Sequence, residues 1–366
     1  MYSIFAVCAP GLEPVLLEEV QALGCKGRAV AGGVELQGSH RELMTLNLWL
    51  RTASRVLVRL GDLKATTFPE LVRKASALPW DKFVRGAAQL RVTCRKSRLY
   101  HSGAVAERLH AAMEARVGGK VALQKASDDD DGAGPQLFVA RFDHDVCTVS
   151  ADSSGALLHQ RGYRGPQAKA PLRETLAAAL LLAAKWDPTT PLCDPLCGSG
   201  TIAIEGALIA LRRAPGLSRT FAFQGWPGFD VRPFQELLAA ARAGERPMPA
   251  PIEASDQDAG AVSATRENAA RAGVSLQIAQ RQLAQLPAAA GPGLVACNPP
   301  YGVRVGGDVR RVFRELGDAA RRRPGQAVAA VIADESAALA SGLHWTRLLR
   351  TQNGGLPVQL LAARPA

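Results

Sequence analysis

The sequence contains few of the residues that metal sites and nucleophilic active sites use. Its 366 residues include six His, and its seven Cys are scattered, with no Cys-x-x-Cys pair beside a metal-like partner. Metal sites usually need such clusters, so we predict no metal. No nucleophile with an adjacent base stands out either. The Cys residues are expected to be small apolar side chains in a reducing compartment.

Long apolar runs are also missing. No stretch approaches the roughly 20 residues that a membrane-spanning helix needs. The first eight residues lack a basic start and a long apolar core, and Glu13, Glu18 and Glu19 follow them closely. They therefore indicate a first strand and not a secretion signal. We expect a soluble cytoplasmic protein.

Acidic residues are outnumbered by basic ones. The chain has 33 Asp and Glu against 44 Lys and Arg, a net charge of +11 and a pI near 9.7. This balance favours an anionic partner, although a basic surface that serves only solubility would look the same. With 47% hydrophobic residues, a chain of this length can build two or three domains with their own cores.

The basic residues cluster between residues 82 and 125, where ten Lys and Arg stand against two Glu. The densest part is the segment 95–98. Clustering in one unit favours a surface that contacts phosphates without reading the base sequence; the alternative is a helix face of solvated charges. The residues that we predict to contact RNA are Arg91, Arg95, Lys96, Arg98 and Lys120.

The most informative motif is Asn298-Pro299-Pro300-Tyr301, which follows the apolar run 294–297. It is expected at the C-terminal mouth of a strand, where open α/β sheets place their ligands. Two prolines remove backbone donors and stiffen the chain, which leaves carbonyl acceptors, an Asn amide and an aromatic ring. We call this motif the rim, and its acceptors and ring suit a planar base with an exocyclic amino group. A plain turn at the end of a strand is the alternative.

A second motif runs from Asp194 into an apolar helical stretch that begins near Ile202. Two glycines let the backbone approach a ligand closely. The third glycine of the dinucleotide fingerprint and the Lys of a phosphate-binding P-loop are both missing. A ligand without phosphates is therefore favoured over a bare turn. The candidate residues are Asp194, Cys197, Gly198, Ser199, Gly200 and Thr201.

A third motif is Asp256, which ends the predicted strand that starts at Ile252. An acid at this position can accept two hydrogen bonds from ribose hydroxyls; a solvated loop residue is the alternative. Asp258 is predicted to cap a helix that Gly273 ends. Residues 212–250, rich in Pro, Arg and Trp, read as an insertion between the second and third motifs.

The N-terminal half alternates short helical and strand patterns. Residues 4–7 and 90–94 read as strands, residues 12–23 and 68–77 as helices, and residues 30–36 as one further strand. Elements of this size indicate small α+β units.

In this order, the three motifs resemble class I methyltransferases that use S-adenosyl-L-methionine. The resemblance makes the Asp194 segment the cofactor loop, Asp256 the ribose acid and Asn298-Pro-Pro-Tyr301 the signature of amino-group methylation. Upstream, His159-Gln-Arg-Gly-Tyr-Arg resembles the segment that these enzymes place before the cofactor loop. Where the family usually has an acid facing the adenine amino group, this chain has Gln282, whose oxygen can still accept a hydrogen bond.

The N-terminal half extends the resemblance over essentially the whole chain. Ala9-Pro-Gly-Leu-Glu, Leu50-Arg-Thr-Ala-Ser-Arg-Val-Leu and Leu78-Pro-Trp-Asp are similar to THUMP-domain RNA methyltransferases, above all to the bacterial 23S rRNA guanine-N2-methyltransferases in their stand-alone form. The resemblance implies a ferredoxin-like unit (1–55), a THUMP RNA-binding domain (56–155) and a Rossmann-like methyltransferase domain (156–366).

The expected function is methylation of a guanine N2 in structured RNA, with 23S rRNA as the substrate and Asn298, Pro299, Pro300 and Tyr301 as the catalytic rim. A tRNA guanine-N2-methyltransferase is the nearest enzyme alternative. An adenine-N6 DNA enzyme would share the rim but would not need the N-terminal half. A non-catalytic RNA-binding assembly factor is the alternative from another class. The rim's own chemistry would serve guanine or adenine, so the choice of base rests on the resemblance.

Overall fold

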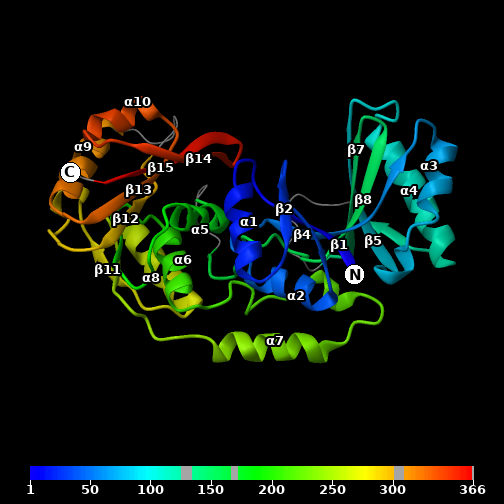
Figure 1. Ribbon diagram of the computed structural model, residues 1–366, viewed down its shortest axis with the longest axis horizontal. Coiled ribbons are helices and arrows are strands. Elements are labelled where there is room, and N and C mark those ends of the chain that lie inside the picture. The colour runs from blue at the N-terminus through cyan, green and yellow to red at the C-terminus, as the bar shows by residue number, and fades with distance from the viewer. Residues whose placement is uncertain (125–133, 166–171, 301–308, 365–366) are drawn as a thin grey trace.

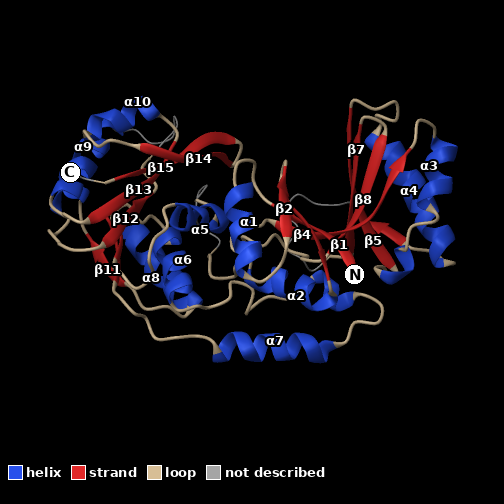
Figure 2. Ribbon diagram, viewed as in Figure 1, coloured by secondary structure: helices blue, strands red, loops and turns tan. Residues whose placement is uncertain are grey.

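The computed structural model describes residues 1–124, 134–165, 172–300 and 309–364. Two β-sheets lie side by side, one in each half of the chain, and helices pack on both (Figures 1 and 2). In the described residues the N-terminal sheet has eight strands and the C-terminal sheet has seven. The expected α+β N-terminal part followed by an open α/β sheet is confirmed.

The N-terminal sheet has the order β2-β3-β1-β4-β8-β7-β5-β6. Its strands are β1 (Tyr2–Val7), β2 (Gly27–Val30), β3 (Gly33–Gly38), β4 (Arg55–Lys64), β5 (Ala87–Arg95), β6 (Ala122–Gln124), β7 (Gln136–Asp143) and β8 (Val146–Asp152). Strand β4 pairs with β1 on one side and with β8 on the other, both antiparallel. The boundary that we propose between residues 55 and 56 therefore falls at the start of a strand that the two N-terminal units share.

Local sequence signals account for the N-terminal helices, which are α1 (Glu13–Ala22), α2 (His40–Trp49), α3 (Phe68–Ala75) and α4 (Ser102–Val117). Ser39 begins α2 with a capping box, because its hydroxyl accepts from Glu42 N and its own N–H donates to the Glu42 carboxylate. The expectation of one strand over residues 30–36 was wrong. A turn at Gly32, whose φ is +86°, splits this region into the hairpin β2–β3.

The C-terminal sheet has the order β11-β10-β9-β12-β13-β15-β14, in which all neighbours are parallel except those that involve β15. Its strands are β9 (Leu192–Asp194), β10 (Ile252–Asp256), β11 (Gln277–Gln280), β12 (Gly293–Cys297), β13 (Gln326–Ile332), β14 (Thr346–Asn353) and β15 (Leu356–Ala363). The chain leaves β9 towards β10 and later returns to β12 on the other side. The sheet therefore has a topological switch point between β9 and β12, the usual place for a ligand.

Both faces of this sheet are buried. Along β12, Leu294 and Ala296 belong to one apolar core, whereas Val295 and Cys297 belong to a second core that Phe313 joins. This alternation follows from the two-residue period of a strand and explains why the run reads as continuously apolar. The helices of this half are α5 (Glu174–Ala183), α6 (Thr201–Ala210), α7 (Val231–Ala243), α8 (Ala259–Ala272), α9 (Val309–Arg321) and α10 (Glu335–Ala338).

Residues 212–250, expected as an insertion, connect the two halves of the molecule. Helix α7 lies outside the C-terminal sheet, along one side of the molecule (Figure 1). Before it, Phe223 N donates to Ser153 O at 3.1 Å and Trp226 Nε1 donates to Gln136 Oε1 at 2.7 Å. The Trp226 ring also meets Phe83 edge-on, with ring centroids 4.8 Å apart. These contacts join the segment to the N-terminal sheet.

Candidate active site

Three polar side chains meet at the carboxyl ends of neighbouring strands. Asp194 ends β9, Asp256 ends β10, and Asn298 directly follows β12. All three line one cavity of about 300 Å³ at the switch point of the sheet. Its lining residues are Leu172, Asp194, Leu196, Cys197, Gly198, Ser199, Thr201, Ile202, Asp256, Gln257, Asn298, Pro300 and Val312.

Residues 195–200, which we call the glycine loop, form one wall of the cavity. Gly198 and Gly200 have φ values of +53° and +84°, which favour glycine. A Cβ on Gly200 would lie 2.8 Å from Thr265 Cγ2, so this glycine allows α8 to approach the loop. A Cβ on Gly198 would meet no atom within 4 Å. Gly200 itself does not line the cavity.

The carboxylates of Asp256 and Asp194 lie beside the glycine loop. Asp256 Oδ2 accepts from Gly198 N at 2.9 Å, and its Oδ1 accepts from Asp258 N at 3.0 Å. Each carboxylate oxygen keeps a further lone pair for a ligand hydroxyl. Asp194 is 1% exposed, and burial raises the pKa of its carboxyl well above the usual range. Asp258 caps α8 and Gly273 ends it, as predicted.

Helix α8 supplies two loop contacts that sequence reasoning missed. Thr265 Oγ1 donates to Gly198 O at 2.8 Å, and Asn268 Nδ2 donates to Ser199 O at 2.8 Å. Both side chains are buried, with exposed fractions of 0% and 3%. Their three-residue spacing puts them on one helix face. The sequence does carry a signal for these contacts, because the two polar residues stand on a helix face that should be apolar.

Gln282 lies apart from the cavity. It follows β11, is exposed, and precedes a short helix formed by Leu283–Gln285, where its backbone oxygen accepts from Gln285 N at 2.9 Å. Gln257 lines the cavity instead. A contact between Gln282 and a ligand stays a prediction.

The rim motif contributes three described residues. Asn298 Oδ1 is buried and has no hydrogen-bond partner among the described residues, and Pro300 lines the same cavity. Pro299 lines a neighbouring cavity of about 160 Å³ together with Phe313 and Asp334. Tyr301 lies outside the described residues. An amide oxygen buried without a partner costs about 1–3 kcal/mol, so such atoms mark places where a ligand can donate.

The predicted RNA-contact residues do not all lie together in the structure. Arg95, Lys96 and Arg98 are exposed at the C-terminal end of β5, and we call these three residues the basic patch. Lys120 precedes β6, which pairs with the start of β5, so roughly 25 Å of strand separates it from the patch. Arg91 lies within β5 and is partly buried. RNA contact by these residues stays a prediction.

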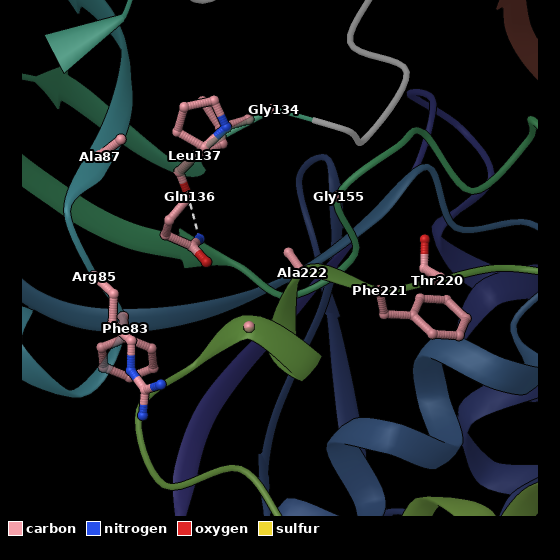
Figure 3. Close-up of a pocket in the computed structure, with 12 residues that line it drawn as sticks. Phe83, Arg85, Ala87, Gly134, Gln136, Leu137, Gly155, Thr220, Phe221 and Ala222 are labelled. Carbon is pink, nitrogen blue, oxygen red and sulfur yellow. Dashed lines mark hydrogen bonds between the residues drawn. The ribbon is translucent and has the colours of Figure 1, made fainter. Parts of the chain in front are cut away.

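A further cavity, of about 290 Å³, lies between the N-terminal sheet and the segment before α7 (Figure 3). The amide of Gln136 is its central polar group. Its Nε2 donates to Leu137 O and Asp152 O, both at 2.8 Å, and its Oε1 accepts from Trp226. Because these bonds use the amide, we interpret the cavity as part of the junction between the two halves.

The described part of the chain offers neither a metal-binding group nor a membrane-spanning helix. No group of three or more His, Cys, Asp or Glu side chains there could hold a metal ion. Within the same residues, no helix is both long enough and apolar enough to cross a membrane.

Two protein families match this sequence. The family described as RMKL-like, methyltransferase domain, matches residues 161–353, and the RlmL ferredoxin-like domain matches residues 3–57. The first match includes the glycine loop, Asp256 and the rim.

Individual relatives agree with the family matches. A candidate RNA methyltransferase of Synechocystis sp. is 34% identical over 98% of this chain and 95% of its own length. The ribosomal RNA large subunit methyltransferase K/L of Syntrophotalea carbinolica is 36% identical over 98% of this chain, but this chain spans only 53% of that protein.

Solved structures share the whole architecture. A Listeria monocytogenes protein, described as a predicted N6-adenine-specific DNA methylase, is 32% identical with a TM-score of 0.88, over 100% of this chain and 96% of its own. SMU.472, a methyltransferase by its description, was solved as a complex with SAH. It is 27% identical with a TM-score of 0.87, over 100% of this chain and 98% of its own.

Proposed function

Because the chain belongs to the RMKL-like methyltransferase family, we propose that it methylates the exocyclic amino group (N2) of a guanine in 23S rRNA. The cofactor is S-adenosyl-L-methionine. The RNA substrate is supported by the names of two relatives, one an RNA methyltransferase and the other a large-subunit rRNA methyltransferase. The choice of guanine is supported by the resemblance of the sequence to guanine-N2 enzymes.

The residues of the cavity fit this cofactor. The Asp256 carboxylate has lone pairs left for two ribose hydroxyls, as the fingerprint of nucleoside-binding sheets requires. Open space beside Gly198 lets a ligand lie directly against the backbone. When bound, S-adenosyl-L-methionine supplies an electrophilic methyl group.

The observation that carries the proposal is the buried Asn298 oxygen beside this cavity, which no other described residue contacts by a hydrogen bond. A base amino group has two N–H donors. Asn298 Oδ1 would accept one, and the Pro299 carbonyl would accept the other. Both oxygens then face the positive charge that develops on the nitrogen as it attacks, which stabilises the transition state. Positioning supplies much of the remaining rate, so no dedicated base is needed.

The N-terminal half supports a nucleic acid as the partner. The basic patch is exposed, and no ion pair between it and another described residue is present. Cations without internal partners are suited to phosphate contacts. The Listeria relative is described as an adenine DNA methylase, and the rim alone accepts either base, so the test must report base and nucleic acid together.

The test is Asn298→Ala, assayed with 23S rRNA, tRNA and DNA as methyl acceptors and mass spectrometry of the nucleosides. Wild type should form N2-methylguanosine in 23S rRNA. The variant should lose about 10²–10³ in kcat, the usual cost of removing one preorganised transition-state contact, and should still bind the cofactor product. Gln277→Ala removes an exposed amide on β11 and is the matched control. Formation of N6-methyladenine, or wild-type turnover by Asn298→Ala, contradicts the proposal.

A further inference from the structure

The segment 158–165 joins the N-terminal half to the glycine loop, and we call it the strap. At its start, Leu158 N donates to Ser54 O at 2.8 Å and Arg161 Nη2 donates to Arg51 O at 2.6 Å. The strap is therefore hydrogen-bonded to the chain just before β4.

A buried carboxylate on α6 fixes the middle of the strap. Glu205 is 0% exposed, and its Oε1 accepts from the Tyr163 hydroxyl at 3.1 Å and lies 3.6 Å from Arg161 Nε. The Arg161 and Tyr163 side chains are buried as well. Charged and polar groups buried in this way are costly to separate, so this part of the strap holds one position on α6.

The end of the strap reaches the glycine loop through α8. Arg271 Nε donates to Tyr163 O at 2.8 Å, and Gly165 N donates to Asn268 Oδ1 at 3.3 Å. Arg271 Nη2 donates to the same Asn268 oxygen at 2.6 Å. The amide is thus oriented with its Nδ2 towards Ser199 O, 2.8 Å away in the glycine loop.

Arg164 makes a second, parallel connection. Its Nη2 donates to Leu172 O at 2.8 Å and to Thr201 Oγ1 at 3.1 Å, and its Nε lies 3.1 Å from Glu174 Oε1. Leu172 and Thr201 both line the active-site cavity. The Arg164 guanidinium therefore connects two walls of that cavity.

We propose that the strap sets the conformation of the glycine loop, with Asn268 and Arg164 as positioning residues for cofactor binding. The loop contains two glycines with positive φ, so its backbone has little preference of its own and is ordered by outside contacts. Holding it in the bound conformation before the ligand arrives raises affinity, because the ordering cost is already met. The proposal rests on the proposed function only for the identity of the cofactor.

The test measures binding of S-adenosylhomocysteine to the full-length protein by calorimetry. Asn268→Asp keeps the acceptor for Arg271 and Gly165 N but places an oxygen against Ser199 O. Arg164→Met removes the bridge to Thr201. Each should raise the Kd at least tenfold. The matched control is Arg266→Lys, at an exposed position on α8, which should leave the Kd unchanged.

RNA affinity and thermal unfolding are measured on the same variants. A positioning role predicts that the cofactor Kd changes while RNA binding stays near wild type. The unfolding temperature should stay near wild type for Asn268→Asp and should fall for Arg164→Met, which leaves the buried Glu174 carboxylate without its cation. Cofactor Kd values within twofold of wild type overturn the proposal, as does an equal loss of RNA affinity. Absence of S-adenosylhomocysteine binding by wild type would instead contradict the proposed function.

Discussion

Substituting Asp256 with Asn should weaken cofactor binding while leaving the fold intact. The two carboxylate oxygens accept from Gly198 N and Asp258 N and have lone pairs left for the ribose. The amide keeps one oxygen and replaces the other with a donor, so at least one charge-assisted hydrogen bond is lost. Such a bond contributes about 1.5–3 kcal/mol, which corresponds to about a 10- to 100-fold higher Kd.

Asp258→Asn is the matched control for this experiment. It removes the same charge two residues away, and Asn caps a helix about as well as Asp. Asp258 Oδ1 accepts from Ala261 N, and the residue does not line the cavity. Titration calorimetry with S-adenosylhomocysteine gives both Kd values. Equal Kd values for wild type and Asp256→Asn would refute the role of this carboxylate. A higher Kd for Asp258→Asn than for wild type would show that the overall charge, and not the Asp256 contact, determines cofactor affinity.

The other predictions concern RNA binding, pH and stability. Replacing all three residues of the basic patch with Ser should weaken RNA binding and flatten its dependence on salt concentration; an unchanged slope in a filter-binding series removes the patch from the interface. Burial and nearby arginines lower the pKa of His159 to about 3, below the value of about 6.5 expected in the unfolded chain. Below pH 6.5 the unfolded state then binds more protons than the folded state, so the unfolding free energy should fall as the pH drops, by at most about 1.4 kcal/mol per pH unit. Urea unfolding at pH 7 and pH 5 checks this, because the unfolding free energy of His159→Gln should depend less on pH than that of wild type. Arg55 pairs with Asp152, and both side chains are buried, so Arg55→Met should cost about 3–5 kcal/mol in unfolding free energy; a loss below 1 kcal/mol would contradict this.

Local patterns were sufficient where one element carries the signal. The ends of β9, β10 and β12 follow from predicted strands that stop at Asp194, Asp256 and Asn298. The cap at Asp258 and the stop at Gly273 follow from residue preferences at helix ends. The β2–β3 hairpin was missed because Gly32 interrupts a run that otherwise has strand character. Gly200 was assigned to the ligand, whereas its missing Cβ makes room for Thr265 on α8.

The sequence by itself determined which strand ends and which loop meet at the cavity, because strand ends, glycines and prolines impose strong local constraints on the backbone. It also determined the family, through motifs whose order along the chain is preserved. Only the tertiary structure decided what holds those motifs in place. Thr265, Asn268 and the strap reach the glycine loop from distant positions in the chain, and the amide oxygen of Asn298 is left without a partner in the part of the chain that the structure describes. Such contacts depend on how elements pack, and no short stretch of sequence encodes that packing.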